Sequence, residues 1–266
     1  MNFIITDDGT KLYVELLGEG PPLLMIPGLG AGNWIWDKNK EALSAKFRLI
    51  MPELRGSGRS DKPDHHYSIR LFASDLMTVL KKLDVNQFHL LGVSMGGFIA
   101  QQIAATLIKE VQSVIIACSP LGSENQTGPD GETLCRMIRP RGKNRRERLE
   151  SSYALNFSKE FMANHAGDLE KITRWRIHYP QPEFAYYRQL LAGNAFGGEK
   201  YAKRITAPTL ICAGKDDAVV PLEDIYALKN KISHATFVEF EGRHMFFFEN
   251  AEEFNRTVSD FLQKNS

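Results

Sequence analysis

The sequence predicts an α/β fold in which a mostly parallel, twisted sheet carries helices on both faces. Short apolar runs alternate with helical patterns along most of the 266 residues, which is typical of strands connected by covering helices. The runs are almost continuously apolar, and this pattern indicates strands buried on both faces. The alternation stops once, between about residues 121 and 203, where only helical patterns occur. A helical segment between two strands of one sheet predicts an inserted cap.

Eight apolar or alternating runs are expected to form the strands of this sheet. Six of them, taken to be mainly parallel, are residues 23–26, 47–51, 88–93, 111–118, 209–213 and 236–240. Two earlier runs, residues 2–6 and 11–17, flank an Asp8-Gly9 turn and are expected to pair antiparallel.

Helical patterns fill the gaps between these runs, and two of them carry start signals. Ser68 precedes an apolar face that begins at Ile69, so its hydroxyl is expected to cap that helix. Asn250 is expected to cap the last helix, with Glu253 three residues later as its capping-box partner. The apolar stripe of this last helix comprises Phe254, Val258, Phe261 and Leu262.

The domain organisation follows from the position of the helical segment. Residues 1–120 and 204–266 are expected to form the two parts of one core, and residues 121–203 the cap. The cap begins with a polar, glycine-containing loop at residues 122–131. Its helical patterns are rich in aromatic residues: Tyr153, Phe157, Phe161, Trp175, Tyr179, Phe184, Tyr186, Tyr187 and Phe196.

Composition and charge exclude several classes of protein. Hydrophobic residues make up 43% and charged residues 24% of the chain, the balance of a globular protein. A formal net charge of +1 provides no field that would attract nucleic acid or an anionic membrane. No run approaches the roughly 20 apolar residues of a membrane span, and the N-terminus has no signal-peptide pattern. Cys118 and Cys212 lie in apolar runs that indicate buried thiols, and a cytoplasmic protein is expected.

The strongest motif follows the run at residues 88–93. Gly92-x-Ser94-x-Gly96 comes directly after this apolar run and directly before a helical pattern. A serine hydroxyl is a weak nucleophile, and a sharp strand-to-helix turn holds it where a base can reach it. A side chain in place of either flanking glycine would clash in so tight a bend. We therefore predict that Ser94 is a nucleophile and not a chance match at a strand end.

A serine nucleophile needs a base, and one of the seven histidines is placed to supply it. His244 follows Gly242 in the loop between the last strand and the last helix. Loops at the carboxyl ends of strands are where open α/β sheets place their sites. The other histidines lie in a polar loop, in a strand, in the cap or just before the last strand: His65, His66, His89, His165, His178 and His234.

The base needs a carboxylate that fixes its tautomer, and two neighbouring aspartates are available. Asp216 and Asp217 lie in Gly214-Lys-Asp-Asp-Ala-Val-Val-Pro221, directly after the run at residues 209–213. This segment and Gly-x-Ser-x-Gly together resemble the α/β-hydrolase family, in which the triad runs Ser, Asp, His along the chain. The resemblance implies that Asp217, four residues before Pro221, is the acid and that Asp216 is an exposed neighbour.

The resemblance covers both flanks of the cap and implies further roles. The oxyanion hole would consist of the N–H of Met95, directly after the nucleophile, and that of Leu29 in the loop after an earlier strand. Some family members carry the acid earlier in the chain, where Glu124 is the nearby carboxylate. The segment Val93-Ser-Met-Gly-Gly-Phe-Ile-Ala-Gln101 is similar to that of small bacterial esterases and enol-lactonase-like enzymes.

Two segments depart from the usual family pattern. Pro27-Gly28 stands where the family usually has His-Gly, which affects a side chain but leaves the backbone donors in place. Pro52-Glu-Leu-Arg-Gly-Ser-Gly-Arg-Ser-Asp61 has Glu53 where an aspartate is usual. We interpret the second segment as a structural turn tied by arginine hydrogen bonds near the top of the sheet.

These motifs predict a serine hydrolase that cleaves a small carboxylic ester, thioester or lactone and needs no cofactor or metal. The same triad also serves C–C bond hydrolysis, acyl transfer and perhydrolysis, and some proteins of this fold are slow-turnover small-molecule receptors. A dinucleotide site is disfavoured because Asn33 interrupts the Gly-x-Gly-x-x-Gly spacing that Gly28, Gly30 and Gly32 begin. The histidines, cysteines and carboxylates lack the sequence spacing of metal ligands.

A cationic run lies in the cap. It comprises Arg136, Arg139, Arg141, Lys143, Arg145, Arg146 and Arg148. Most such runs are solvated faces, and we expect one here. The alternative is a surface that receives an anionic acyl carrier, either a phosphopantetheine protein or coenzyme A.

Overall fold

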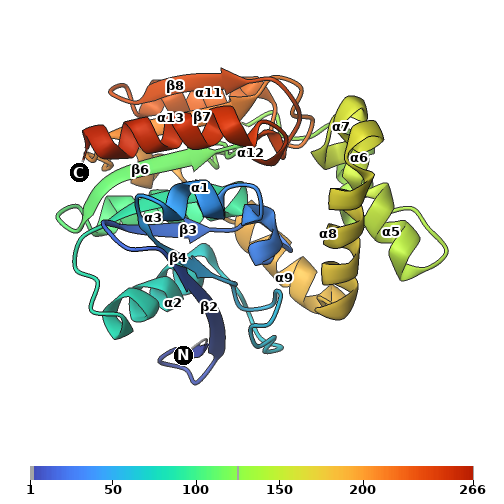
Figure 1. Ribbon diagram of the computed structural model, residues 1–266, viewed down its shortest axis with the longest axis horizontal. Helices are drawn as coiled ribbons and strands as arrows, with labels where there is room; N and C mark the ends of the chain where they lie inside the picture. The colour runs from blue at the N-terminus through green and yellow to red at the C-terminus, as the bar shows by residue number, and fades with distance from the viewer. Residues whose placement is uncertain (1–2, 125, 266) are drawn as a thin grey trace.

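The computed structural model describes residues 3–124 and 126–265 (Figure 1). Within these residues the strands form one eight-stranded sheet in the order β1-β2-β4-β3-β5-β6-β7-β8. The strands are β1 (Phe3–Ile5), β2 (Lys11–Leu17), β3 (Pro22–Ile26), β4 (Arg48–Pro52), β5 (Phe88–Val93), β6 (Val111–Ala117), β7 (Thr209–Gly214) and β8 (Thr236–Phe240). All eight expected strands are present, although Asn2, which the first was expected to include, lies outside the described residues.

Strand directions follow the sequence prediction. β1 pairs antiparallel with β2, and β2 pairs antiparallel with β4. The pairs from β4 through β3, β5, β6 and β7 to β8 are all parallel. The carboxyl ends of the parallel strands therefore lie at one edge of the sheet, which is where ligand sites of open α/β sheets form.

Helices cover both faces of the sheet, because the strands are apolar on both sides. Leu24 and Ile26 of β3 pack into one buried cluster with α2 (Ile69–Lys82), α3 (Met95–Thr106) and α11 (Leu222–Lys231). Leu23 and Met25 of the same strand point the other way and pack with α1 (Lys40–Ser44) and α13 (Ala251–Lys264). Alternation along a strand thus divides the core into two layers.

The two expected helix caps have different outcomes. The Ser68 hydroxyl accepts a hydrogen bond from Leu71 N at 3.1 Å, which confirms the cap of α2. The capping box at the last helix is wrong. Asn250 occupies the N-cap position of α13, but its side chain makes no cap hydrogen bond. Its amide N–H donates instead to the carbonyl of Glu241 at 2.6 Å, and this tertiary bond orients the side chain away from the cap geometry.

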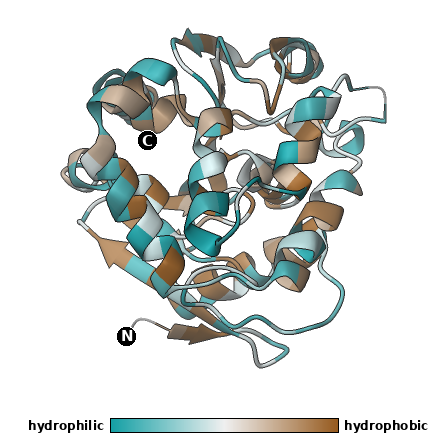
Figure 2. Ribbon diagram, turned by 90° about the vertical axis from the view of Figure 1, so that its right-hand side faces the viewer, coloured by the Kyte–Doolittle hydropathy of each residue, from teal (hydrophilic) through white to brown (hydrophobic). Residues whose placement is uncertain are grey.

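The cap is an insertion between β6 and β7. It contains α4 (Gly131–Ile138), α5 (Arg145–Ser151), α6 (Tyr153–Asn156), α7 (Lys159–Asn164), α8 (Ala166–His178), α9 (Glu183–Asn194) and α10 (Glu199–Ala202). Helices α5 to α9 stand as a layer at one end of the sheet (Figure 1). Seen from the cap side, these helices mix hydrophilic and hydrophobic segments (Figure 2). The expected all-helical insertion is confirmed.

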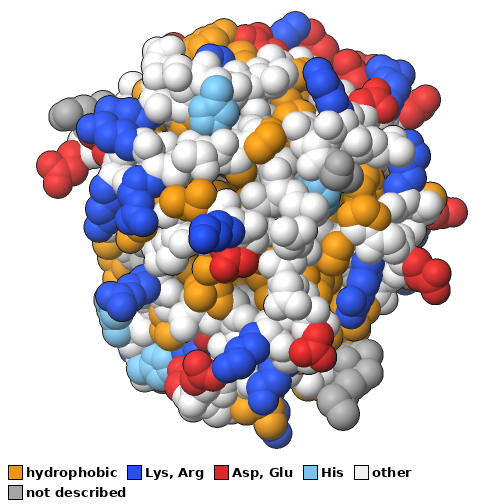
Figure 3. All heavy atoms as spheres, turned by 90° about the vertical axis from the view of Figure 1, so that its left-hand side faces the viewer, with side chains coloured by type: hydrophobic (Ala, Val, Ile, Leu, Met, Phe, Trp, Pro, Cys, Tyr) orange, Lys and Arg blue, Asp and Glu red, His pale blue; other side chains and the backbone are white. Residues whose placement is uncertain are grey.

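The opposite end of the molecule carries Lys and Arg side chains and Asp and Glu side chains scattered among one another (Figure 3). This mixture agrees with the formal net charge of +1. Among the described residues, no helix has the length and apolar character that crossing a bilayer requires.

Candidate active site

Ser94 lies at the turn between β5 and α3. Its φ of 54° and ψ of −123° are sparsely populated for a residue with a side chain, so the turn is strained. The bend is also too tight for side chains on either side. A Cβ at Gly92 would lie 2.3 Å from the carbonyl oxygen of Gly96, and one at Gly96 would lie 2.2 Å from that of Ile26. The sequence therefore holds Ser94 at an elbow, with its side chain at the carboxyl end of the sheet.

His244 and Asp217 form a buried hydrogen-bonded pair. His244 Nδ1 lies 2.8 Å from Asp217 Oδ2, and the two residues are only 8% and 6% exposed. The other carboxylate oxygen of Asp217 accepts hydrogen bonds from the backbone N–H groups of Val219 and Val220, at 2.8 and 3.0 Å. These bonds fix the carboxylate, and the carboxylate in turn fixes the orientation of the imidazole.

The alternative residues lie elsewhere. Asp216 is exposed, and so is Glu124. His89 is fully buried inside β5, where burial lowers the pKa of its imidazole to about 4. Burial also raises the pKa of the Cys118 thiol, and the nearby Asp217 carboxylate raises it further. Cys118 is therefore a neutral thiol beside the site, and a neutral thiol is a poor nucleophile.

The loop between β3 and α1 lies against the elbow. A Cβ at Gly28 would lie 3.1 Å from Ser94 Cβ, closer than an ordinary contact, so the glycine helps this loop to approach the elbow. Leu29 lines the same cavity as Ser94. Met95 is the first residue of α3, and an N–H at this position has no partner within its own helix.

A cap residue holds the same loop from above. Gln189 of α9 is fully buried, and its Oε1 accepts a hydrogen bond from Gly30 N at 2.9 Å. Its Nε2 donates to the carbonyl of Arg55 and to the hydroxyl of Ser57, both at 2.9 Å. One side chain of the cap thus joins two loops at the top of the sheet.

The segment from Pro52 to Asp61 has the structural role expected of it. Glu53 is fully buried and accepts a hydrogen bond from Arg59 Nη2 at 2.7 Å and another from Asn33 N at 3.1 Å. The second bond ties Glu53 to the end of the loop that carries Leu29. The glutamate therefore supports this loop and makes no contact that suggests catalysis.

Ser94 and His244 both line a cavity of about 550 Å³ between the core and the cap. This volume lies within the range of small-molecule sites, roughly 300 to 1,000 Å³. Much of the wall is apolar and comes from both parts of the protein: Leu29, Trp34, Ile35, Ile138, Leu149, Leu155, Phe157, Val219 and Phe247.

A second anchor ties the cap to the loop of His244. The carbonyl of Asn156 accepts a hydrogen bond from Met245 N at 2.8 Å. Glu249 accepts bonds from the backbone N–H and the hydroxyl of Ser158, at 3.0 and 2.6 Å. The cap is thus attached beside both His244 and the Leu29 loop.

The cationic run of the cap divides into two sets. One set lines the cavity and comprises Arg136, Arg139, Arg145 and Arg148. The other set comprises Arg141, Lys143 and Arg146, of which Arg141 and Arg146 lie near Glu132 and Glu150, at 3.8 and 2.8 Å. The expected solvated face therefore holds for six of the seven residues, since Arg139, Arg145 and Arg148 are exposed as well, and Arg136 is partly buried.

A family model for the alpha/beta hydrolase fold matches residues 21–251. The chain belongs to the α/β-hydrolase family. A pimeloyl-acyl-carrier-protein methyl ester esterase of Aeromonas salmonicida is 27% identical to it, over 95% of this chain and 99% of the relative. The structure of an esterase from Exiguobacterium antarcticum matches with a TM-score of 0.87 and 27% identity, over 98% and 99% of the two chains. An enol-lactonase structure from Burkholderia xenovorans has the same TM-score and coverage at 23% identity, which shows the shared fold.

The structure of this α/β hydrolase also reveals residues that sequence reasoning missed. Gln189 and Arg176 both contribute to the site, the first through the Gly30 loop and the second as part of the cavity wall. The sequence marks neither residue, because both lie in helices whose buried side depends on how the cap packs. Among the described residues, no group of three or more His, Cys, Asp or Glu side chains is arranged to hold a metal ion.

Proposed function

We propose that this α/β hydrolase is a serine hydrolase that cleaves a small carboxylic ester, thioester or lactone through an acyl-enzyme on Ser94. One observation carries the proposal. The strained Ser94 elbow and His244 line the same cavity, and Asp217 holds His244 from behind through a 2.8 Å hydrogen bond. A bond at Nδ1 leaves the Nε2 of the imidazole to act on the serine.

In the first step, His244 removes the proton of the Ser94 hydroxyl as the serine oxygen attacks the substrate carbonyl. The negative charge that develops on the carbonyl oxygen is stabilised by the N–H groups of Leu29 and Met95. His244 then gives its proton to the leaving alcohol, thiol or, in a lactone, the ring oxygen. The acyl group remains on Ser94.

In the second step, water replaces the leaving group. His244 takes a proton from the water, the hydroxide attacks the acyl carbonyl, and the same two N–H groups stabilise the oxyanion. Collapse of this intermediate releases the acid and returns the proton to Ser94. The Asp217 carboxylate stabilises the imidazolium in both steps, and no cofactor takes part.

Two further observations support this chemistry. The cavity wall is largely apolar, which suits an acyl chain or a ring. By name, the similar protein from Aeromonas salmonicida is a methyl ester esterase and that from Exiguobacterium antarcticum an esterase. The similar structure from Burkholderia xenovorans is that of an enol-lactonase. We extend ester or lactone cleavage to this chain on both grounds.

Covalent labelling tests the proposal directly. An alkyl fluorophosphonate should phosphonylate the intact protein with loss of fluoride, and peptide mass spectrometry should locate the adduct on Ser94. The Ser94→Ala variant is the control and should stay unlabelled. A screen of graded p-nitrophenyl esters and lactones should then show turnover well above background. An adduct on the Ala variant, or turnover at the background rate, would contradict the proposal and favour a receptor.

A further inference from the structure

Arg176 differs from the other arginines that the fold buries. Arg55 is fully buried and donates to both oxygens of Asp75, at 2.6 and 2.7 Å. Arg59 is likewise held by Glu53. Arg176, on α8, is partly buried, and no carboxylate of residues 3–124 or 126–265 lies within 4.0 Å of its guanidinium. No ion pair within this described part of the chain therefore offsets the charge of Arg176 in the cavity wall.

The groups that contact the Arg176 guanidinium are neutral. The Ser152 hydroxyl accepts a long hydrogen bond of 3.4 Å from its Nη1, and the ring of Trp34 lies 6.0 Å from its Cζ. Burial lowers the pKa of the guanidinium, and the charge of Arg145 lowers it further. Trp34 itself is only 8% exposed, and its indole N–H has no acceptor in the described part of the chain. Arg176 thus has no anionic partner, and the Trp34 N–H has no acceptor, within the residues that the structure describes.

The cavity as a whole is electropositive. Its wall contains one carboxylate, Glu183, and five arginines. The arginines are Arg136, Arg139, Arg145, Arg148 and Arg176. Charges of one sign around a partly enclosed cleft raise the local concentration of the opposite ion. The potential therefore favours a negatively charged ligand next to Ser94.

Packing fixes the position of Arg176 before any ligand binds. The next residue towards the N-terminus, Trp175, packs so closely on the loop after β3 that a Cβ at Gly32 would lie 2.0 Å from its ring. One turn earlier, the Thr173 hydroxyl lies 2.7 Å from the Tyr153 hydroxyl. Helix α8 is thereby held on both sides, and a preorganised donor loses less entropy when it binds an anion.

We propose that the cavity selects substrates whose acyl part carries a carboxylate, and that Arg176 binds this carboxylate. The planar guanidinium offers two parallel N–H groups that match the two oxygens of a carboxylate. The apolar residues in the wall of the same cavity suit a hydrocarbon stem between the ester and the carboxylate. The proposal rests on the proposed function, since it names the substrate class of the Ser94 site. The substrate is thus a monoester of a dicarboxylic acid, or a lactone that bears a carboxylate.

Matched pairs of substrates test this selectivity. The charged series consists of monomethyl esters of succinic to suberic acid, and the neutral series of methyl alkanoates of equal chain length. The measured quantity is the ratio of kcat/KM for the charged ester to that for its neutral partner. In Arg176→Gln this ratio should fall about 10- to 100-fold, the range for a lost charge-assisted hydrogen bond. Arg176→Lys should recover part of the loss, because lysine keeps the positive charge but lacks the two parallel N–H groups.

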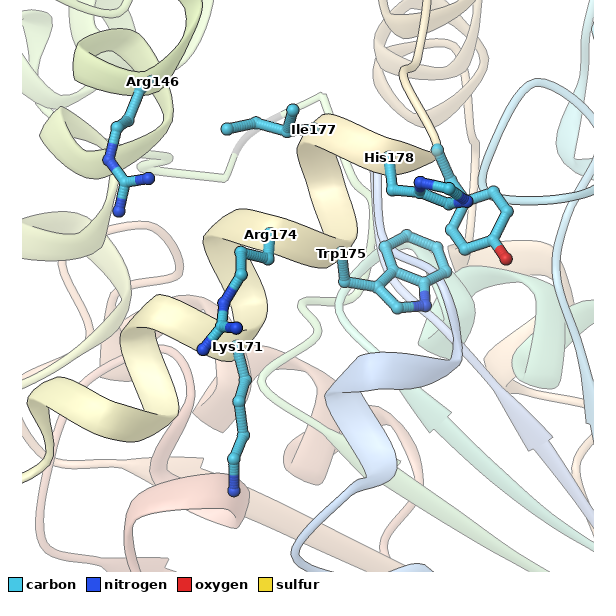
Figure 4. Close-up of a pocket in the computed structure, with 7 residues that line it drawn as sticks. Arg146, Lys171, Arg174, Trp175, Ile177 and His178 are labelled. Carbon is cyan, nitrogen blue, oxygen red and sulfur yellow. The ribbon is translucent and has the colours of Figure 1, made fainter.

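Arg174→Gln is the matched control on the same helix. Arg174 is 70% exposed, pairs with Glu170 at 3.3 Å and lines a shallow outer groove. Figure 4 shows Arg174 and Lys171 extending away from Trp175. The control should leave the ratio unchanged. An equal fall in both variants would overturn the role of Arg176, since it would reflect general surface charge.

A binding measurement keeps the inference testable without turnover. Titration calorimetry with adipate should show binding to the unmodified protein and at least tenfold weaker binding to Arg176→Gln. If esters are cleaved but neither the ratio nor adipate binding depends on Arg176, the inference fails and the proposed function stands. If Ser94 is never labelled but adipate binds through Arg176, the proposed function fails and the anion site stands. A preference for carrier-linked thioesters with no preference for free carboxylates would also overturn the inference.

Discussion

The core and the cap of this α/β hydrolase differ in the length and the burial of their helices. In the core, α2 has 14 residues, eight of them buried, and packs along the sheet. In the cap, α5 has seven residues, none of them buried, and α6 has only four. The triad candidates stand on the core, whereas the outer wall of their cavity stands on the cap. If the proposed function holds, the core carries the reaction chemistry and the cap governs the choice of substrate.

The largest effect is expected at the elbow of the core. Ser94→Ala should lower kcat for an activated ester by about 10⁴- to 10⁶-fold, because the nucleophile is lost. Far-UV circular dichroism and the thermal midpoint should stay close to those of the unmodified protein, since the hydroxyl supports no core packing. Stopped assays over hours can resolve the residual rate. A loss of less than tenfold in a folded variant would move the chemistry away from Ser94.

The next effect separates two adjacent aspartates of the core. Asp217→Asn should cost about 10⁴-fold in kcat, because an amide facing Nδ1 leaves His244 in the wrong tautomer. Asp216→Asn is the matched control and should change kcat less than twofold, since Asp216 is exposed. Steady-state kinetics on one ester decide the comparison. Equal, mild losses of kcat in the two variants would mean that the acid lies elsewhere, and Glu124 would be the next residue to test.

A smaller effect is expected where the cap contacts the core. Gln189→Leu removes the acceptor of Gly30 N and the donor to Arg55 and Ser57. The loop of Leu29 should then shift, and displacements of about 1 Å can cost on the order of 100-fold in rate. We expect kcat to fall 10- to 100-fold, while phosphonate labelling of Ser94 slows in parallel.

The control for this variant is the neighbouring residue of α9. Arg188 also links cap and core, but it does so through Asp64, which is exposed. Surface ion pairs contribute about 0 to 1 kcal/mol, so Arg188→Gln should leave kcat nearly unchanged. If both variants behave alike, Gln189 has no special role in positioning the loop.

The smallest effect is expected on the outer face of the cap. Arg141→Gln combined with Arg146→Gln should change kcat/KM less than twofold for p-nitrophenyl esters and for coenzyme A thioesters alike. Both side chains are exposed, and such charges act mainly on association and are screened by salt. A loss confined to thioesters that disappears at 1 M salt would instead identify an anionic carrier as the partner.

The sequence predicts the core far better than the cap, and the reason is physical. The strands, the Ser68 cap and the Ser94 elbow depend on neighbours within a few residues. The order of parallel strands then brings the loops of Ser94, Asp217 and His244 to one edge of the sheet. The contacts of Arg176 and Gln189 depend instead on how the cap helices α8 and α9 pack against the core. Asn250 shows the same limit, because a tertiary hydrogen bond from its amide to the Glu241 carbonyl sets the orientation of the side chain.

The double attachment of the cap has a consequence for how such a protein can diversify. One attachment is at Met245 and the other at Gly30, so the cap holds both the loop of His244 and the loop of Leu29. The stretch from residue 139 to 148, exposed except at Pro140, lies outside these two attachments. Replacements there can reshape the mouth of the cavity without disturbing proton transfer. Randomising this stretch alone is therefore a practical route to new ester preferences. The residues that form the two attachments should be kept unchanged in such a library.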